Sequence, residues 1–564
     1  MARNDDPEKA AKRALLSKLS PLQGMMWTRH SSPVVPTPVN LLLADQLARC
    51  LRDPCNAPRW HQLAGSWFGS DAADRRAVLE HLAGPAACRA TTAPAANLLR
   101  LTFLDGLGHD AGALPEAARL TLEIDPVDVD RIAGWMSFAT ARGLRDAADR
   151  STFARTLLES RVPEMAARLA HHLASLSAAQ PWLPRRVPED IARVAIVLPY
   201  AGNAVHTPSA LALDYAHVCV RLGWSVHLFS CQEMLPPDTL LYRGDGLDLS
   251  LAKLDLEHWG RSLPPGMSLT VGEPRLSVEA RWRQIRADVS RFDPDLVFLV
   301  GLYSPLAAVL QPWRPAIGVN VHTIPPVAPL DVWLTGDAGL HGKRVDSFGG
   351  QFPAFEAFHH PYRMRIDTSA PPLPRGELGV PDDALLAITV GFRLPEEIHG
   401  EFAARVTALL RARQDLHWLL LGGNGTLPPA LAGAPRGQVH PVVARTDVPR
   451  VLRSADLFLN PPRMGGGFSV AEAMACGVPV LSLAGSDGGD KLGEEASDNL
   501  DAYLLRLEQV LVDGAAREAL GKKLRARFAA VYDLDSGGPS LRQAALRALA
   551  LFRERAWEGA TPAA

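Results

Sequence analysis

The sequence contains no long hydrophobic run. None of its 564 residues lies in an uninterrupted apolar stretch of about 18, the length that marks a candidate membrane-spanning helix. The N-terminal segment is charged and lacks the apolar core of about 7–15 residues that a secretory signal peptide has. These two absences predict a cytoplasmic protein without a transmembrane segment.

Cysteine is scarce, and neither sign of charge dominates. The six cysteines form no Cys-x-x-Cys pair and have no histidine at zinc-binding spacing, so we interpret them as reduced, buried thiols. Lys and Arg number 59 against 61 Asp and Glu, a balance that argues against a dedicated nucleic-acid-binding protein. With 47% hydrophobic residues the chain can bury a full core, and its length suggests about three domains.

Two patterns follow each other along the chain. Up to about residue 185, apolar residues recur three and four apart, as in Val129–Arg142, which predicts an all-α domain over residues 1–185. The spacing Trp60–Trp67 matches the opening of a tetratricopeptide-type hairpin once, so helical-hairpin repeats and an irregular helical domain both stay open. Three prolines in Pro181–Pro188 indicate a linker, because they cannot sustain a helix.

From residue 190 short, continuously apolar runs alternate with helical stretches. Val194–Leu198 is the first such run, and the alternation restarts at Leu385–Val390 after a proline-rich stretch. Strands that are apolar on both faces and alternate with helices predict a parallel sheet covered on both sides. We therefore predict an α/β fold of two Rossmann-like doubly wound domains behind the helical domain, with the site in the cleft between them. The predicted segments are 190–370, 371–540, and a C-terminal helix and tail at 541–564.

The most informative stretch is Asp456–Leu483, which predicts a strand, a glycine-rich loop, a short helix and a second strand. We expect the helix to begin at Ser469, with Glu472 completing a capping box, and to end at Gly477. Backbone N–H groups and the partial positive charge at such a helix start suit a diphosphate. The loop before the helix carries three glycines that allow a close approach, Gly465, Gly466 and Gly467.

This stretch resembles the C-terminal-domain signature of GT-B glycosyltransferases, especially the retaining family 4. In that family a glycine-rich turn leads into a helix with a glutamate and then Ala-Met-Ala-Cys-Gly-x-Pro-Val. The resemblance implies a GT-B fold over about residues 190–550 and a nucleotide-sugar donor, with its diphosphate on the loop and its ribose hydroxyls on Glu472. An earlier family glutamate, which contacts the donor sugar, is replaced here by Met464, so the sugar stays open.

Further positions agree with the resemblance. Arg393 matches a strand-end Gly-Arg-Leu motif and would grip the diphosphate with a bidentate guanidinium. The family's lysine a few residues later is absent, so Arg463 and Lys491 are candidate substitutes, with a solvated surface charge as the alternative for each. The predicted donor-binding residues are Gly423, Asn424, Arg463, Gly465, Gly466, Gly467, Phe468, Ser469, Glu472 and Lys491.

In the first α/β domain, the loop after the first strand would face donor and acceptor. By the resemblance, Gly202 and Asn203 are acceptor or sugar contacts there. His206 in the same loop would contact the donor sugar or the acceptor, and His322 at a later strand end would lie beside the donor sugar. Together with Arg393 they are the predicted catalytic residues, and a hydrogen-bonded loop histidine is the alternative for both.

No Asp-x-Asp motif follows a strand as metal-dependent GT-A enzymes require, so we predict no metal and no cofactor beyond the nucleotide-sugar substrate. Helix N–H groups and Arg393 would instead stabilise the charge that develops on the leaving diphosphate. The prediction is a retaining, metal-independent glycosyl transfer.

The acceptor has several candidates. A large helical domain before a GT-B core resembles bacterial protein glycosyltransferases, which favours a flagellin- or adhesin-like protein acceptor. A lipid-linked or polysaccharide acceptor is the runner-up, since the basic N-terminal segment could contact a membrane peripherally. A catalytically silent GT-B binding module and a sugar-nucleotide epimerase are two further hypotheses, and nucleotide binding would discriminate the silent module.

Overall fold

The computed structural model describes most of the chain beyond residue 113. The predicted Trp60–Trp67 pattern rests on residues outside the described part. In the described helices, none is long and apolar enough to cross a membrane. The described residues are 42–46, 49, 62, 66, 113–123, 129–146, 149–176, 183–184, 186–202, 207–233, 263, 266–273, 276–321, 324–423, 425–463 and 465–558.

Two compact units divide the chain. One comprises residues 1–138 with 238–247, and the other comprises residues 139–237 with 248–564. In the first unit, helix α6 (Ala113–Leu122) buries Leu114, Ala117 and Ala118, which lie three and four apart on one face. The boundary between the two units falls at residue 138, and residues 139–185 lie in the second unit.

The second unit begins inside helix α7 (Val129–Asp146) and continues with α8 (Arg150–Glu159) and α9 (Val162–Ser175). Asp149 caps α8 by accepting a hydrogen bond from the Thr152 backbone N–H at 2.7 Å. Helix α9 buries an apolar face and packs against α13 (Pro305–Leu310), which follows a strand of the first sheet. Helix α9 therefore belongs to the same compact unit as that sheet.

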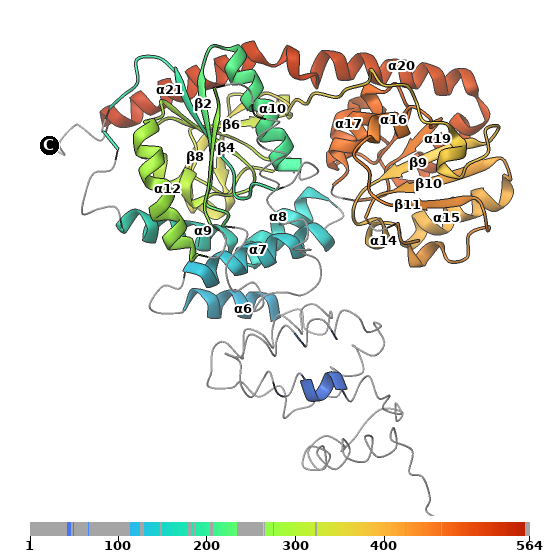
Figure 1. The fold of residues 1–564 in the computed structure, drawn as a ribbon, viewed down its shortest axis with the longest axis horizontal. Coiled ribbons are helices and arrows are strands. Elements are labelled where there is room, and N and C mark those ends of the chain that lie inside the picture. Colours follow the sequence, from blue (N-terminus) through green and yellow to red (C-terminus); the bar gives the residue numbers. More distant parts are fainter. Residues whose placement is uncertain are drawn as a thin grey trace, which may run out of the picture. The chain divides into compact units, whose positions relative to one another are not determined.

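The first sheet has eight strands in the order β3-β2-β1-β4-β5-β6-β8-β7 (Figure 1). All neighbouring pairs are parallel except β7 with β8 at the edge, an antiparallel pair that the sequence reasoning missed. The strand order reverses between β1 and β4, so their carboxyl ends form the switch point where ligands bind in such sheets. The strands are β1 Arg193–Val197, β2 Ser225–Ser230, β3 Ser268–Val271, β4 Leu296–Val300, β5 Ala316–Val319, β6 Val332–Thr335, β7 Arg344–Ser347 and β8 Phe352–His359.

The second sheet has five parallel strands in the order β11-β10-β9-β12-β13. Its order reverses between β9 and β12, and its edge strand β11 contains Pro441, which is tolerated at an edge. The predicted α/β class with two parallel sheets is confirmed. The strands are β9 Leu385–Val390, β10 Leu416–Leu421, β11 Val439–Val442, β12 Leu457–Leu459 and β13 Val480–Leu481.

Helices cover both sheets. The second sheet is accompanied by a series of helices, and the last helix of the chain, α21, packs against β5 and β6 of the first sheet. The chain therefore returns to the first sheet after completing the second. The helices are α10 Thr207–Arg221, α12 Val278–Phe292, α14 Leu394–Glu397, α15 Gly400–Ala412, α16 Val448–Leu452, α17 Gly467–Ala475, α18 Asp487–Leu492, α19 Leu500–Val512, α20 Gly514–Val531 and α21 Gly538–Glu558.

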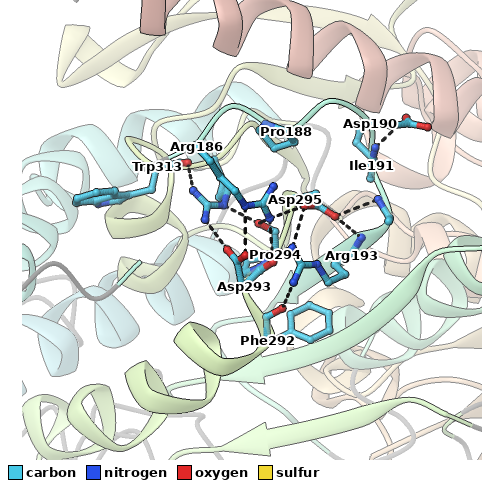
Figure 2. A network of polar contacts seen from close by, with 12 residues as sticks. Arg186, Pro188, Asp190, Ile191, Arg193, Phe292, Asp293, Pro294, Asp295 and Trp313 are labelled. Atoms are coloured by element: carbon cyan, nitrogen blue, oxygen red, sulfur yellow. Dashed lines mark hydrogen bonds and ion pairs between the residues drawn. The ribbon is translucent and has the colours of Figure 1, made fainter. Parts of the chain in front are cut away.

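A network of ion pairs fixes the segment before β1 to the start of β4 (Figure 2). Asp293 accepts from the fully buried Arg314 at 2.5 Å and from Arg186 at 3.2 Å. Asp295 accepts from Arg186 at 2.5 Å and from the Arg193 backbone N–H at 2.8 Å. Asp293 also ends helix α12 in the left-handed region, at φ 46°. The carboxylates of Asp293 and Asp295 therefore fix the segment before β1 to the residues that precede β4.

We expect Asp293→Asn to lower the free energy of unfolding by about 3 kcal/mol, because it leaves the buried Arg314 guanidinium without its ionic partner. Asn tolerates the left-handed backbone, so the change isolates the charge. Urea denaturation checks it, with Glu518→Gln on the exposed Glu518–Lys522 pair as the control that should shift stability by less than about 1 kcal/mol. Equal effects of the two variants would contradict the role of the network.

Candidate functional site

The carboxyl ends of the second sheet gather a glycine loop, three basic side chains and a buried acid. Helix α17 begins at Gly467, two residues earlier than predicted, because Gly466 is its N-cap with φ 87°. The predicted capping box is therefore wrong. Ser469 is the third residue of the helix and donates to the carbonyl groups of Gly466 at 3.0 Å and Val390 at 3.3 Å, while Glu472 lies in the second turn, too far along to cap.

The predicted end of this helix is confirmed. Gly477 follows the C-cap in the left-handed region, with φ 75°. Its N–H donates to the Met474 carbonyl at 3.0 Å, and that of Val478 donates to the Ala473 carbonyl at 2.9 Å, which is the Schellman pattern.

Each glycine of the loop faces a basic side chain. A Cβ on Gly466 would come within 2.5 Å of the Arg463 guanidinium. One on Gly467 would lie 2.7 Å from Lys491 Nζ and 2.8 Å from the Tyr362 hydroxyl, and one on Gly465 would lie 3.5 Å from Arg393 Nη2. A side chain on Gly466 or Gly467 would therefore collide with these neighbours, whereas one on Gly465 would make only an ordinary contact with Arg393.

Two of these cations share one carboxylate. Arg393 donates to Glu397 Oε1 at 2.9 and 3.2 Å, and Arg463 donates to Glu397 Oε2 at 2.7 Å. Burial tends to raise the pKa of Glu397, but the two guanidiniums outweigh it and hold the pKa below its usual value. Glu397 is one of the positions 396–399 among which the resemblance expects a lysine, and the sequence analysis did not assign it a role.

Arg463 and Arg393 differ in how many of their guanidinium nitrogens donate hydrogen bonds within the protein. Arg463 is buried, and its other nitrogens donate to Asn460 Oδ1 at 2.8 Å and to the Val390 carbonyl at 2.9 Å. A solvated surface charge is thereby excluded for Arg463. The Arg393 side chain is 37% exposed and bonds Glu397 with only one edge of its fork, which leaves Nη1 available to a ligand.

Lys491 is also buried rather than solvated. It lies in helix α18. Its Nζ donates to the Asp487 carbonyl at 3.0 Å and sits 4.0 Å from the centre of the Tyr362 ring. Burial lowers the pKa of Lys491 to about 8, against the opposing carboxylates of Asp487 and Asp490.

Glu472 is half-buried on α17. Burial raises the pKa of its carboxyl to about 8, and no hydrogen bond to that carboxyl is found within the described ranges. Phe468 packs partly against the core, and Gly423, at φ 54°, comes close to the Phe392 carbonyl. Asn424 and Met464 lie outside the described residues.

At the first sheet, two side chains fix the loop after β1. Gln232 Oε1 accepts a hydrogen bond from the Ala201 N–H at 3.1 Å, and Gln232 Nε2 donates one to the Ala201 carbonyl at 3.3 Å. Ser209 Oγ accepts from the Gly202 N–H at 2.9 Å. Gln232 does this from a left-handed backbone, with φ 53°. The next predicted residues of the loop, Asn203 and His206, and also His322, lie outside the described part.

Glu233, after β2, is a buried acid that the sequence reasoning missed. Among the described residues no donor meets either of its oxygens in good hydrogen-bond geometry, although the Ser304 hydroxyl is near, and burial raises the pKa of Glu233 to about 8. No sequence pattern marks it, because its neighbours Arg281 on α12 and Ser304 before α13 lie far from it in the sequence. Across the described residues, no group of three or more His, Cys, Asp or Glu is arranged to hold a metal ion.

Comparisons with known proteins agree on one class. Residues 386–512 match the family model described as glycosyl transferases group 1. The UDP-N-acetylglucosamine--N-acetylmuramyl-(pentapeptide) pyrophosphoryl-undecaprenol N-acetylglucosamine transferase of Salmonella newport is 26% identical over 282 residues, covering 50% of this chain and 74% of the relative. The Salmonella typhi enzyme of the same name is 27% identical over 283 residues.

Among solved structures, a mutant O-GlcNAc transferase from Thermobaculum terrenum aligns with 99% of this chain and 100% of its own, with a TM-score of 0.53 and 16% identity. That likeness concerns the fold. Together with the two doubly wound sheets and the family match at the glycine loop, it identifies the chain as a glycosyltransferase with the GT-B fold.

We expect Gly466→Ala to destabilise the protein by about 1–3 kcal/mol, because alanine would be forced to a positive φ and its methyl group against the Arg463 guanidinium. Gly465→Ala is the matched control, since its methyl group would meet only Arg393 Nη2, at 3.5 Å. Its change should stay within about 0.5 kcal/mol. Thermal and urea unfolding of both variants measure the difference, and equal stabilities would show that the loop is not constrained as described.

Proposed function

We propose that this glycosyltransferase binds the diphosphate of its nucleotide-sugar donor at the start of α17. The observation that supports this most is the convergence of Arg393, Arg463 and Lys491 on the Gly465–Gly467 loop. The first N–H groups of a helix have no acceptor within the helix and carry its positive end. An anion placed there would meet these N–H groups and two nearby cations at once.

The three basic side chains have different roles in this proposal. Arg393 would contact the diphosphate with the part of its guanidinium that Glu397 leaves available. Lys491 would supply a buried ammonium beside Gly467. Arg463, with its nitrogens on Glu397, Asn460 and Val390, would hold the loop in place rather than contact the donor.

The chemistry follows from where charge develops. As the bond between the anomeric carbon and the diphosphate breaks, negative charge grows on the leaving oxygen. Fixed N–H groups and cations stabilise that charge more in the transition state than in the bound donor, which lowers the barrier. His206 and His322 stay proposed catalytic residues beside the donor sugar, with Gly202 and Asn203 as proposed acceptor or sugar contacts.

Glu472 is our proposed ligand of the ribose hydroxyls, with Phe468, Ser469, Gly423 and Asn424 around the nucleotide. A cap is excluded for Glu472 by its place in the second turn. Its half-buried carboxyl has no protein donor in the described surroundings, which suits a site that ligand hydroxyls complete.

We further propose UDP-N-acetylglucosamine as the donor. The names of the Salmonella newport relative and of the Thermobaculum terrenum structure both contain this sugar. These names support the proposal by relationship, and a panel of nucleotide sugars offered to the full chain tests it.

Glu472→Gln is expected to weaken UDP binding about tenfold or more at alkaline pH, because a hydrogen bond to a charged group is worth about 1.5–3 kcal/mol. Since burial raises the Glu472 pKa to about 8, the carboxyl is mostly neutral below that pH and resembles the amide. The ratio of the two dissociation constants should therefore grow as the pH rises through about 8. Calorimetry at pH 7 and pH 9 measures this ratio.

The ratio separates Glu472 from Lys491, whose loss of charge over the same pH range weakens both proteins alike. The effect of pH on the stability of the fold through Glu472 has the opposite sign to its effect on this ratio. Folding raises the pKa of the Glu472 carboxyl. The contribution of Glu472 to the free energy of unfolding therefore falls as the pH rises from the ordinary pKa of a glutamate to about 8. A ratio near one at pH 9, with both proteins folded, would remove Glu472 from the proposed ribose site.

We propose a protein acceptor, with the helical segment before the first sheet as its recognition surface. The Thermobaculum terrenum structure supports this by relationship, since it aligns over nearly the whole chain, including the helical segment. The Salmonella newport relative, named for a pyrophosphoryl-undecaprenol acceptor, covers only half of the chain and supports the lipid-linked alternative. Retention of configuration, metal independence, bacterial protein glycosylation and cytoplasmic location stay predictions.

We expect radiolabelled sugar to enter the protein fraction of a bacterial lysate supplied with the full chain, because a protein acceptor retains the label until a protease releases it. The measurement compares protease-released label with organic-extractable label from the same reaction. Heat-treated enzyme gives the background. Label confined to the organic phase would replace the protein acceptor with a lipid-linked one.

A further inference from the structure

Tyr362 occupies a buried position in the segment that connects the two sheets. It follows β8 of the first sheet, which ends at His359, and precedes β9 of the second sheet. Its side chain is 8% exposed. The sequence reasoning assigned it no role, and the donor-site proposal above does not use it.

The ring of Tyr362 faces the ammonium group of Lys491. The distance from Lys491 Nζ to the ring centre is 4.0 Å, well inside the range of about 6 Å over which an aromatic face attracts a cation. The hydroxyl of the same tyrosine borders Gly467, since a Cβ there would lie 2.8 Å from it and 2.7 Å from Nζ. Ring, ammonium and the first residue of α17 therefore share one small space.

A buried lysine needs such a partner to stay charged in one place. Lys491 is 2% exposed, and its Nζ donates a hydrogen bond to the Asp487 carbonyl at 3.0 Å. Burial disfavours the charged form, and a four-carbon side chain has several rotamers. The face of an aromatic ring favours the charged form and limits the rotamers, and it does so without accepting an N–H hydrogen bond. The N–H groups of the ammonium that do not bond Asp487 can therefore bind an anionic ligand.

Tyr362 is itself held on both sides. Two residues before it, His360 Nδ1 lies 2.7 Å from Ser540 Oγ on α21. Two residues after it, the Met364 N–H donates to the Tyr532 carbonyl at 2.9 Å, and the Leu534 N–H donates back to the Met364 carbonyl at 3.1 Å. The ring thus comes from a fixed backbone, which is the requirement for a residue that orients another.

We propose that Tyr362 is the positioning residue for Lys491: its ring holds the lysine charged beside Gly467, where the donor diphosphate would bind. The inference rests on the proposed function for the role of Lys491, and adds the residue that makes this lysine effective. Tyr362 itself touches neither the donor nor the reacting atoms in this proposal.

The experiment is a double-mutant cycle on UDP binding by the full chain. Lys491→Met is expected to weaken UDP, and Tyr362→Leu to weaken it about 5- to 30-fold, the range expected for the loss of a desolvated cation–π contact. In the double variant, Tyr362→Leu should add little to Lys491→Met, because the ring acts through the ammonium. Tyr362→Phe retains the ring and should bind UDP within about twofold of the unmodified protein.

A pH series supplies a readout that mere loss of packing would not move. Removing the ring should lower the pKa of Lys491, so UDP affinity should start to fall at a lower pH in Tyr362→Leu than in Tyr362→Phe. Phe402→Leu, which shortens a buried aromatic of α15, is the control and should leave this pH unchanged. Besides Tyr362, the charged or titratable groups that act on Nζ among the described residues are Asp487 and Asp490 on α18 and Tyr532 after α20, while Arg527 on α20 bonds the Lys491 backbone carbonyl.

The outcomes distinguish this inference from the proposed function. If the unmodified chain binds no UDP, or if Lys491→Met binds it as tightly as the unmodified chain, the donor-site proposal fails. If Lys491→Met weakens UDP but Tyr362→Leu weakens it equally in both backgrounds, only the positioning role is overturned. Should Tyr362→Leu not fold, Tyr362→Met replaces it, and melting temperatures accompany every affinity.

Discussion

The arrangement of the candidate site depends on one ion-pair network, in which Glu397 joins the buried Arg463 to the partly exposed Arg393. A buried carboxylate between two guanidiniums is strongly coupled to both, and removing it would leave Arg463 charged and without an ionic partner in the interior. Through Arg463 the same group reaches Asn460 and the Val390 carbonyl, at the ends of β12 and β9. The glycine loop is shaped around these side chains, so its course follows from the ion pair.

The three basic side chains around the start of α17 each have a carboxylate nearby. Glu397 offsets part of the charge of Arg393 and Arg463, while Asp487 and Asp490 oppose the desolvation of Lys491. These carboxylates keep the cations charged in a poorly solvated place. In our proposal a diphosphate would bind where the backbone N–H groups of α17 point, and preorganised donors of this kind stabilise a leaving group more than water does.

The predicted helix at the glycine loop shows how local rules reach a limit. Its end was predicted correctly, because a Gly in the C′ position and a following Pro are local signals that outside contacts seldom override. Its start was misplaced, because Ser469 and Glu472 match a capping box in sequence, yet Gly466 takes a left-handed conformation that Arg463 and Asn460 surround. The local pattern could not include those contacts, and for the same reason it could not predict the burial of Arg463 and Lys491.

The sequence by itself determined the succession of apolar strands and helices, the two parallel sheets and the glycine loop, because periodicity, continuous apolar runs and backbone freedom are properties of neighbouring residues. It also carried the resemblance that identified a GT-B glycosyltransferase. Only the tertiary structure decided that Glu397 joins two arginines, that Tyr362 covers Lys491 and that Glu233 is buried. Those facts depend on packing between segments up to more than a hundred residues apart, such as Tyr362 and Lys491, and burial of this kind sets the charge and position of a side chain in ways that no local pattern records.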